Sequence, residues 1–498
     1  MALTIVDCYT DEAAGLGVPP YLGTYPRYLY GYLASKFPNQ KIYYLTIDDL
    51  RLLYFHKNKV KETLEHQTTD IRIYNLTINS PNIKQVLAET EELFVIVGVQ
   101  VPGKYLTALP GTMHEITEIL RNLQINCKKT LTGPVVFGGT QLVGGKFFEK
   151  IEEQFFEKKE RFNFSYEEMK QYSVKGAAIV QQIINYKIIE IETGKGCNVG
   201  KCSFCTEPLK AKVSYRNNED IVQEIKAFYD LGERYFRLGK QTCFYSLPDP
   251  INLLKNIREQ CPDIKVLHID NVNPIFVPTK KGEEITKAIV QYCSSGNIAA
   301  HGVESFDSVV TKENLLNCNA EMALKAIRVI NKYGAEKGEN GMPKFLPGLN
   351  IIFGLKAESK QTHKENMKYL QQILDENLLL RRINIRQAAL FEGTKLYEDC
   401  GDKFLKKNKK YYWKWRNEIR QKIDLPNLER ILPKGAILKN VIAEIYDGKT
   451  TFMRQIGTYP LIIGVKGRYP LHKFYTIKVT NYMLRSITGE VVKEQESD

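Results

Sequence analysis

Apolar and polar residues alternate along residues 1–185 in a way that predicts short strands separated by helices. LTIVD, KIYYLTI and ELFVIVGVQV are mostly apolar, as expected of strands in a parallel sheet that is covered on both faces. YPRYLYGYLASKF and TMHEITEILRNL are expected to be helices, and GPVVFGGTQ a further strand that ends in paired glycines. This order predicts a doubly wound α/β domain that binds ligands at the carboxyl ends of its strands.

The same alternation continues over residues 186–400. The strand candidates are IIEIETG, YFRLG, VLHIDNV, IAAHGVES, FLPGLNIIFGL and RRINIRQAAL. Helical segments such as NEDIVQEIKAFYDLG and AEMALKAIRVINKYG separate them. Six strand–helix units predict a partial parallel (β/α)6 barrel, with its functional groups at the carboxyl ends of the strands.

The character of the chain changes after residue 400. Residues 401–430 are basic and aromatic, hold both tryptophans, and are expected to form a helical linker. They are either a phosphate-binding helix or a helix that packs both tryptophans beneath the next domain. Residues 431–498 contain short β-rich runs punctuated by Gly and Pro, including YPLIIGVKG and YTIKVTNYMLRSITGEVV, and predict a small all-β barrel.

The length and the net charge of the chain limit how many domains it has and which partners it binds. A chain of 498 residues is long enough for two or three domains. The 70 basic and 57 acidic residues give a net charge of +13, which favours an anionic partner such as RNA; a Lys-rich, Ile-rich surface of the kind thermophiles show gives the same number. No apolar run approaches the length of a membrane span, and the N-terminus is acidic, so we expect a cytoplasmic protein without membrane association.

Three of the ten cysteines are clustered, and they are the strongest chemical signal in the chain. Cys197, Cys202 and Cys205 lie in GKGCNVGKCSFC, directly after the first predicted barrel strand. Structural zinc usually needs four ligands, and no second cysteine pair follows at zinc-finger spacing. Three thiolates on a four-iron cluster leave one iron open to a small molecule. The remaining cysteines are expected to be small core residues: Cys8, Cys127, Cys243, Cys261, Cys293, Cys318 and Cys400.

This cysteine loop at the end of a barrel strand resembles the radical SAM superfamily. The resemblance implies a 4Fe-4S cluster on Cys197, Cys202 and Cys205, whose open iron binds S-adenosyl-L-methionine (SAM). One electron from a donor such as ferredoxin or flavodoxin then cleaves SAM to a 5′-deoxyadenosyl radical. Phe204 matches the family pattern, whereas four residues between the first two cysteines replace the usual three.

The resemblance also assigns residues at the following strand ends. SAM-binding residues are expected to be Phe204, Gly239, Gln241, Glu304, Ser305, Gly354 and Glu358. Asp270, Asn271 and Asn273 are expected at the rim of the substrate or cofactor site. Each of these polar residues taken alone could equally cap a loop, and LGKQ stands where the family often has Gly-Gly-Glu.

A Rossmann-like domain followed by such a barrel resembles the cobalamin-binding branch of the superfamily. Pro102, Tyr105, Gly138 and Gly139 fall in the segments that would hold the cobalamin. The Asp-x-His-x-x-Gly motif that supplies a histidine to cobalt is absent, as it is in several members of the branch. The alternative is a Rossmann-like remnant without a cofactor. The methylthiotransferase branch needs three further cysteines, and this region offers only Cys8 and Cys127.

The C-terminal segments FMRQIGTYPLIIGVKG and SITGEVV resemble the TRAM domain, which implies RNA binding. Phosphate contacts are then expected from Arg454, Lys466, Arg468, Lys473 and Arg485, and base stacking from Tyr459 and Tyr469. The alternative is a barrel that closes the active site, with its aromatic residues buried.

Three functions follow for the whole chain. The leading one is cobalamin-dependent C-methylation of a macromolecular substrate, either tRNA or a protein. The second is tRNA modification by radical SAM chemistry without cobalamin. The third is an RNA-binding protein whose cysteines hold a structural metal. The sequence gives no prediction of the oligomeric state.

Overall fold

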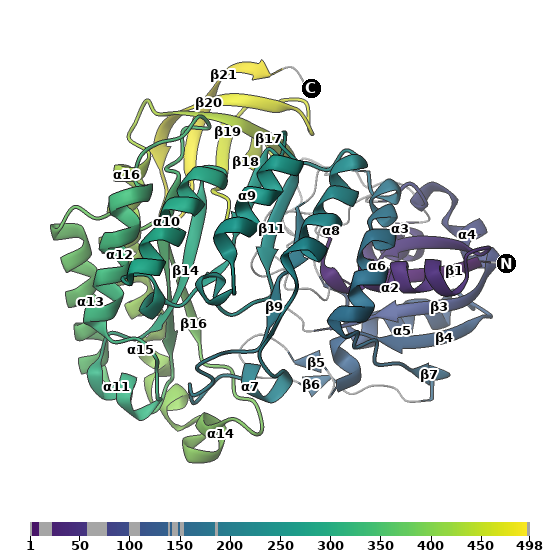
Figure 1. Ribbon diagram of the computed structural model, residues 1–498, viewed down its shortest axis with the longest axis horizontal. Coiled ribbons are helices and arrows are strands. Elements are labelled where there is room, and N and C mark those ends of the chain that lie inside the picture. Colours follow the sequence, from purple (N-terminus) through teal and green to yellow (C-terminus); the bar gives the residue numbers. More distant parts are fainter. Residues whose placement is uncertain are drawn as a thin grey trace. The chain divides into compact units, whose positions relative to one another are not determined.

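Strands and helices alternate along most of the chain in the computed structural model shown in Figure 1. The structure describes residues 2–8, 22–56, 77–98, 110–137, 140–141, 148–149, 154–184 and 188–495. Two compact units are present. Unit 1 comprises Met1–Ile191, Glu219–Phe236 and Ile445–Gly448, and unit 2 comprises Glu192–Asn218, Arg237–Glu444 and Lys449–Asp498. The boundaries expected near residues 185, 400 and 430 stay predictions.

Unit 1 is built on a parallel sheet with the strand order β2-β1-β3-β4-β7. Its strands are β1 (Ala2–Asp7), β2 (Lys41–Thr46), β3 (Thr90–Ile96), β4 (Lys128–Thr132) and β7 (Lys158–Lys159), with a separate hairpin of β5 (Thr140–Gln141) and β6 (Phe148–Glu149). Its helices are α2 (Thr24–Lys36), α3 (Ile47–His56), η1 (Ser80–Asn82), α4 (Ile83–Glu89), α5 (Met113–Asn122), η2 (Pro134–Phe137), α6 (Tyr166–Gly176), η3 (Ala177–Gln182) and α8 (Asn218–Asp230). The predicted doubly wound arrangement is confirmed.

One predicted strand of unit 1 is wrong. The segment GPVVFGGTQ was expected to be extended, but Pro134–Phe137 forms the short 3-10 helix η2, and the strand lies before it as β4. Gly133 has a φ of +96°, and a Cβ there would lie 2.5 Å from the Val97 carbonyl oxygen. This left-handed glycine turns the chain out of the sheet, and the proline that follows has no N–H for a strand ladder.

The predicted barrel strands are present. They are β8 (Ile189–Glu192), β11 (Tyr235–Gly239), β12 (Val266–Ile269), β13 (Asn271–Val272), β14 (Asn297–Glu304), β15 (Phe345–Phe353) and β16 (Arg382–Gln387). They form two sheets, β12-β11-β8 and β13-β14-β15-β16, and the division between the units runs through β8 and β11. The helices are α7 (Glu207–Lys210), η4 (Phe244–Ser246), α9 (Pro250–Gln260), η5 (Pro274–Phe276), α10 (Lys280–Tyr292), α11 (Ser308–Glu313), α12 (Ala320–Gly334), α13 (Lys360–Asp375) and α14 (Lys395–Cys400). All six expected strand segments are confirmed, as is the partial barrel.

Alternating residues of β14, β15 and β16 face opposite sides of this sheet. Val303, Ile351 and Ile385 belong to the apolar core that also includes residues of α12 and α13. The intervening positions therefore face the inside of the partial barrel. On this inner face Gly302 pairs in register with Asn350, and Asn350 pairs with Asn384.

The C-terminal strands form the predicted small barrel. They are β17 (Ile437–Asp447), β18 (Thr450–Gln455), β19 (Ile463–Lys466), β20 (Phe474–Tyr482) and β21 (Ile487–Gln495), closed in the order β17-β18-β19-β21-β20. Three helical segments precede it: α15 (Lys403–Ile419), the π-helical turn η6 (Arg420–Asp424) and α16 (Leu425–Ile431). No helix in the described part of the chain is both long and apolar enough to cross a membrane.

A loop of this C-terminal barrel, residues 457–459, reaches the partial barrel within unit 2. The Thr458 N–H donates to His268 Nδ1 at 3.0 Å, and the Tyr459 hydroxyl donates to Asp270 Oδ1 at 2.9 Å. The Arg382 guanidinium lies 3.9 Å from the centre of the Tyr459 ring. Tyr459 is therefore engaged inside unit 2, which favours the closing role of the barrel over base stacking for this residue.

The contact between His268 and Thr458 makes stability depend on pH. Burial lowers the pKa of His268 from 6.5 to about 4, so the folded chain keeps the imidazole neutral and Nδ1 able to accept. The unfolded chain binds a proton near pH 6.5, so stability is full above that pH and is lost as the pH falls toward 4. The loss is up to about 3 kcal/mol. We expect His268→Gln, which cannot titrate, to lose less stability between pH 7 and pH 5 in denaturant titrations.

The exposed His114 provides the control for this measurement. His114→Gln should show the pH dependence of the wild-type protein. Equal losses of stability in His268→Gln and in the wild-type protein would contradict the assignment.

Candidate functional site

The three clustered cysteines lie on a tight loop after β8 and the short strand β9 (Gly194–Lys195), which pairs with β10 (Ser214–Tyr215). Gly196 has a φ of +79°, and a Cβ there would lie 2.6 Å from the backbone of Lys212 and Val213. The Gly200 N–H donates to Cys197 Sγ at 3.4 Å. Glycine is therefore required where the loop folds back on itself, and the loop leaves all three thiols half-buried.

The thiols and one carboxylate of β14 influence each other electrostatically. Burial, and after it the charges of Cys205, Glu304 and Cys197, raise the pKa of Cys202 to about 12. The three cysteines follow β8 and β9, and Glu304 is the last residue of β14, so the ends of these strands bring the four groups within electrostatic range of one another. Thiolates brought together in this way need a positive partner, and three cysteines suit a four-iron cluster with one open iron.

Among the described residues, no group of three or more His, Cys, Asp or Glu side chains is placed to hold one metal ion. A four-iron cluster holds its cysteines apart by its own width, so this geometry differs from that of a cluster site.

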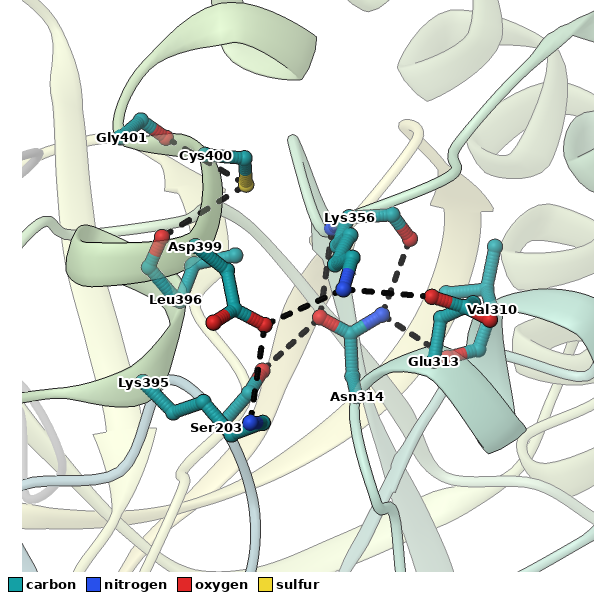
Figure 2. A network of polar contacts seen from close by, with 10 residues as sticks. All are labelled: Ser203, Val310, Glu313, Asn314, Lys356, Lys395, Leu396, Asp399, Cys400 and Gly401. Atoms are coloured by element: carbon teal, nitrogen blue, oxygen red, sulfur yellow. Dashed lines mark hydrogen bonds and ion pairs between the residues drawn. The ribbon is translucent and has the colours of Figure 1, made fainter.

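Asn314 holds the cysteine loop to the rest of unit 2 (Figure 2). The Ser203 N–H donates to the Asn314 carbonyl at 2.9 Å, and the Ser203 hydroxyl donates to Asn314 Oδ1 at 2.8 Å. Asn314 Nδ2 donates to the Lys356 carbonyl at 2.9 Å and to the Val310 carbonyl at 2.8 Å. The Leu396 N–H donates to the Ser203 carbonyl at 2.8 Å. One buried amide thus joins the loop to α11 and to the turn after β15, while Ser203 joins it to α14.

Sequence reasoning missed Asn314. The residue follows α11 as its C-cap, and an asparagine after a helix is an ordinary end signal. Its partner Ser203 lies 111 residues away in the chain, and no local pattern encodes that contact.

Glu304 has an unusual position at the end of β14. It has a φ of +63°, which is uncommon for a residue with a side chain, and its Oε2 is buried without a hydrogen-bond partner in the described structure. Burial raises its pKa to about 7, and the charge of Arg386 opposes this. The missing Cβ of Gly302 would lie 3.1 Å from Glu304 Oε1. Glu304 thus combines a strained backbone with a buried carboxyl oxygen that has no partner in the described structure. This combination indicates a site for a ligand with a hydrogen-bond donor.

Arg386 supplies the opposite charge on the same inner face. With the Asn384 amide oriented so that its oxygen meets the guanidinium, that oxygen accepts from Arg386 Nε at 2.6 Å. The side-chain amide of Asn384 lies 3.0 Å from Asn350 Oδ1. The inner face therefore presents a carboxylate, a guanidinium and two amides, which together suit a ligand that carries both charges.

Several residues expected to bind SAM have partners within the protein. Gln241 Oε1 accepts from the Thr193 hydroxyl at 3.0 Å, and the Gly239 carbonyl accepts from the Thr193 N–H at 3.1 Å. Ser305 Oγ accepts from the Asp307 N–H at 3.2 Å. Phe204 packs beside the apolar cluster that contains Leu396. Their roles toward SAM stay predictions, and their present contacts close turns at strand ends.

Gly354 and Glu358 form a turn that supports α15. Glu358 Oε2 accepts from the Gly354 N–H at 2.8 Å, and its Oε1 accepts from Asn408 Nδ2 at 2.9 Å. Burial raises the pKa of Glu358 to about 7. A Cβ on Gly354 would lie 2.7 Å from Leu405 Cδ1, so this glycine is needed for the packing of α15.

The expected rim residues are also engaged. Asp270 forms a buried ion pair with Arg237 through Oδ2, and its Oδ1 accepts from Tyr459. Asn271 Nδ2 donates to the Gln241 carbonyl at 3.4 Å. Asn273 Oδ1 accepts from the Ile275 N–H at 3.2 Å and caps η5. Pro102, Tyr105, Gly138 and Gly139, expected for cobalamin, lie outside the described residues.

One residue expected to contact RNA phosphate is placed where phosphate cannot reach it. Arg454 is 2% exposed, and its Nε lies 2.6 Å from Glu444 Oε2 inside unit 2. Lys466, Arg468 and Lys473 are exposed in and around the turn between β19 and β20, and Arg485 is exposed between β20 and β21. Their contact with RNA stays a prediction.

The chain thus contains a partial parallel α/β barrel with a three-cysteine loop after its first strand. No family model matches the chain. Uncharacterized protein MJ0274 of Methanocaldococcus jannaschii is 38% identical over 98% of this chain and 93% of its own. An uncharacterized protein of Archaeoglobus fulgidus is 38% identical over 98% of this chain and 90% of its own. The chain belongs to the family of these two proteins.

Solved structures with a similar arrangement include two radical SAM enzymes. TsrM from Kitasatospora setae, a radical S-adenosylmethionine methyltransferase seen with cobalamin and a [4Fe-4S] cluster, has a TM-score of 0.48 at 13% identity, over 80% of this chain and 77% of its own. The cobalamin-dependent S-adenosylmethionine radical enzyme OxsB has a TM-score of 0.48 at 15% identity, over 83% of this chain and 56% of its own.

The structure predicts that Asn314 keeps the cysteine loop in place. Asn314→Ala leaves the Ser203 hydroxyl and buried backbone groups without partners, at about 1–3 kcal/mol for each such group. We expect the variant to retain less than about half of the wild-type iron after anaerobic iron–sulfur reconstitution, because its three thiols are no longer held together. Iron per chain and the melting temperature are the measurements.

Asn252 on α9 is the matched control, since it is an exposed asparagine that bonds only locally to Asp249. Asn252→Ala should retain the wild-type iron content. If the Asn314→Ala variant kept the full iron content and an unchanged melting temperature, Asn314 would not be the residue that holds the cysteine loop in place.

Proposed function

We propose that the chain is a radical SAM enzyme that holds a 4Fe-4S cluster on Cys197, Cys202 and Cys205. The observation that carries the proposal is the three-cysteine loop that follows β8 and β9, with its thiols half-buried and its backbone anchored to Asn314 through Ser203. When bound, the cluster supplies one electron to the sulfonium group of SAM. The half-burial of the loop limits water at this site, and Asn314 fixes its backbone.

The protein's own charges orient SAM in this proposal. The Glu304 carboxylate accepts hydrogen bonds from the ammonium group of the methionine moiety, and the Arg386 guanidinium donates to its carboxylate. Gly302 leaves room beside Glu304 Oε1 for that group. Charge-assisted hydrogen bonds of this kind are about twice as strong as neutral ones.

The proposal extends to cobalamin in unit 1 and to methylation of a carbon atom in a tRNA or protein substrate. Parallel doubly wound sheets bind ligands in the loops beyond the carboxyl ends of their strands. In unit 1 these ends are Asp7, Thr46, Ile96 and Thr132. The cobalamin residues expected from the sequence follow β3 and β4. A flavodoxin- or ferredoxin-type protein supplies the electron.

Loss of the cluster ligands should abolish SAM cleavage. We expect the reconstituted wild-type protein to bind about four iron atoms per chain and to form 5′-deoxyadenosine with dithionite, and the triple Cys→Ala variant at positions 197, 202 and 205 to do neither. Glu304→Gln should keep the iron and lower 5′-deoxyadenosine formation about ten-fold or more, because a neutral amide loses a charged hydrogen bond worth about 1.5–3 kcal/mol.

Glu376→Gln, at an exposed ion pair with Arg328, is the control and should behave as the wild-type protein does. Purified protein that carries zinc and leaves SAM intact would refute the enzyme and favour a structural metal.

Cobalamin binding is expected to be independent of the cluster. Protein purified anaerobically with hydroxocobalamin should contain cobalt, and the triple cysteine variant should keep the cobalt while it loses the iron. Metal analysis for both elements is the measurement. SAM cleavage by a protein that takes up no cobalt would contradict the cobalamin proposal and leave tRNA modification by radical chemistry alone.

A further inference from the structure

The exposed face of α15 is a second surface of unit 2 with its own chemistry. The lysines on this face recur every three or four residues, so they lie one helical turn apart, about 5 Å, along a single stripe. We call it the α15 lysine stripe, and its members are Lys403, Lys406, Lys407, Lys410 and Lys414. Within the described part of the chain, only Lys406 of this stripe forms an ion pair, with Asp402. The stripe is therefore a dense positive charge that is left largely uncompensated.

An exposed tryptophan lies at the C-terminal end of the stripe. Trp413 is 64% exposed and lies between Lys410 and Lys414 on the same helical face. The Arg416 guanidinium lies 5.2 Å from the centre of its ring. Trp415, two residues later, is 5% exposed and stacks on His363 with ring centres 5.1 Å apart. The packing of both tryptophans beneath the C-terminal barrel is therefore wrong, because Trp415 lies in the core of the larger barrel and Trp413 is exposed, while phosphate binding by this helix stays a prediction.

The opposite face of α15 fixes the helix to unit 2. Trp415 and Ile419 belong to the apolar core of the barrel, and Asn408 Nδ2 donates to both the Glu358 carbonyl and its Oε1. Leu405 packs against Gly354. The lysine stripe and Trp413 are thus held out on a rigid support, so a partner meets them without ordering a mobile segment.

We infer that the α15 lysine stripe and Trp413 bind single-stranded RNA. Evenly spaced ammonium groups contact phosphates without reading the sequence, and an exposed indole offers a face on which a base stacks. An acidic protein would satisfy the lysines, but the large exposed ring beside the C-terminal end of the stripe suits a partner made of alternating anionic and flat aromatic groups. This inference is independent of the proposed radical chemistry.

The test uses the full-length protein and a fluorescently labelled oligouridylate RNA of about 12 nucleotides, a length within the range that one single-strand site covers. Fluorescence anisotropy over a series of salt concentrations gives the affinity and its salt dependence. Trp413→Ala is expected to weaken binding about ten-fold, and Trp413→Phe, which keeps a ring, to retain most of the affinity. Unlabelled oligouridylate should also quench the emission of the wild-type protein, because Trp413 is the exposed one of its two tryptophans.

The lysines are tested by charge removal. Lys407→Gln with Lys410→Gln should lower the slope of log affinity against log salt by about 1.4, since each phosphate contact on a single strand contributes about 0.7. Lys281→Gln with Lys325→Gln removes the same charge from exposed positions on α10 and α12 and should leave the slope unchanged.

The inference is overturned if all these variants bind the RNA as the wild-type protein does. It is also overturned if the α15 variants keep RNA binding but lose electron transfer from an acidic flavodoxin or ferredoxin, because the surface then docks a protein. SAM cleavage is measured in parallel, so a failure of the radical chemistry is distinguished from a failure of RNA binding.

Discussion

Gathering three thiols and a carboxyl group at one place is the physical constraint on which the rest of unit 2 depends. Each of these groups raises the free energy of the others when they are charged and partly removed from water. The fold opposes that repulsion with buried hydrogen bonds, and Asn314 is the centre of them because its backbone and its amide both reach Ser203. The left-handed glycine at position 196 allows the loop to reach that anchor. The site is thus held by neighbours that have no charge of their own.

Much of the fold could be predicted from the sequence, because buried parallel strands leave continuous apolar runs that hydropathy alone detects. All six barrel strands were found in this way, and the C-terminal barrel was found from its short β-rich runs punctuated by Gly and Pro. GPVVFGGTQ failed because its apolar character is real but Gly133 turns the chain before it. The spacing of apolar residues indicates which segments are buried. It does not indicate that a single residue such as Gly133 has a positive φ.

The site was only partly predictable, and the reason is physical. Polar residues at the ends of parallel strands can hold a ligand or close the turn that follows, and their residue types are the same in both cases. Gln241, Asp270 and Glu358 each have protein partners, whereas Glu304 keeps a buried oxygen without one. Only the three-dimensional contacts separate these cases. Asn314 was missed because its partner Ser203 lies on a distant segment, and Arg386 because the carboxyl group whose charge it opposes, Glu304, lies on another strand.

The loop of residues 457–459 changes how the C-terminal barrel should be regarded. Tyr459 covers the Arg382 guanidinium and satisfies one oxygen of Asp270, which in turn neutralises Arg237. Cutting the chain ahead of β17 would remove Tyr459. The Arg382 guanidinium would then lose the ring that covers it, and Asp270 Oδ1 would lose its hydrogen-bond donor. The C-terminal barrel is therefore part of the packing of unit 2 as much as an accessory module. A shortened protein would therefore lose contacts within the larger barrel of unit 2 as well as the C-terminal barrel itself.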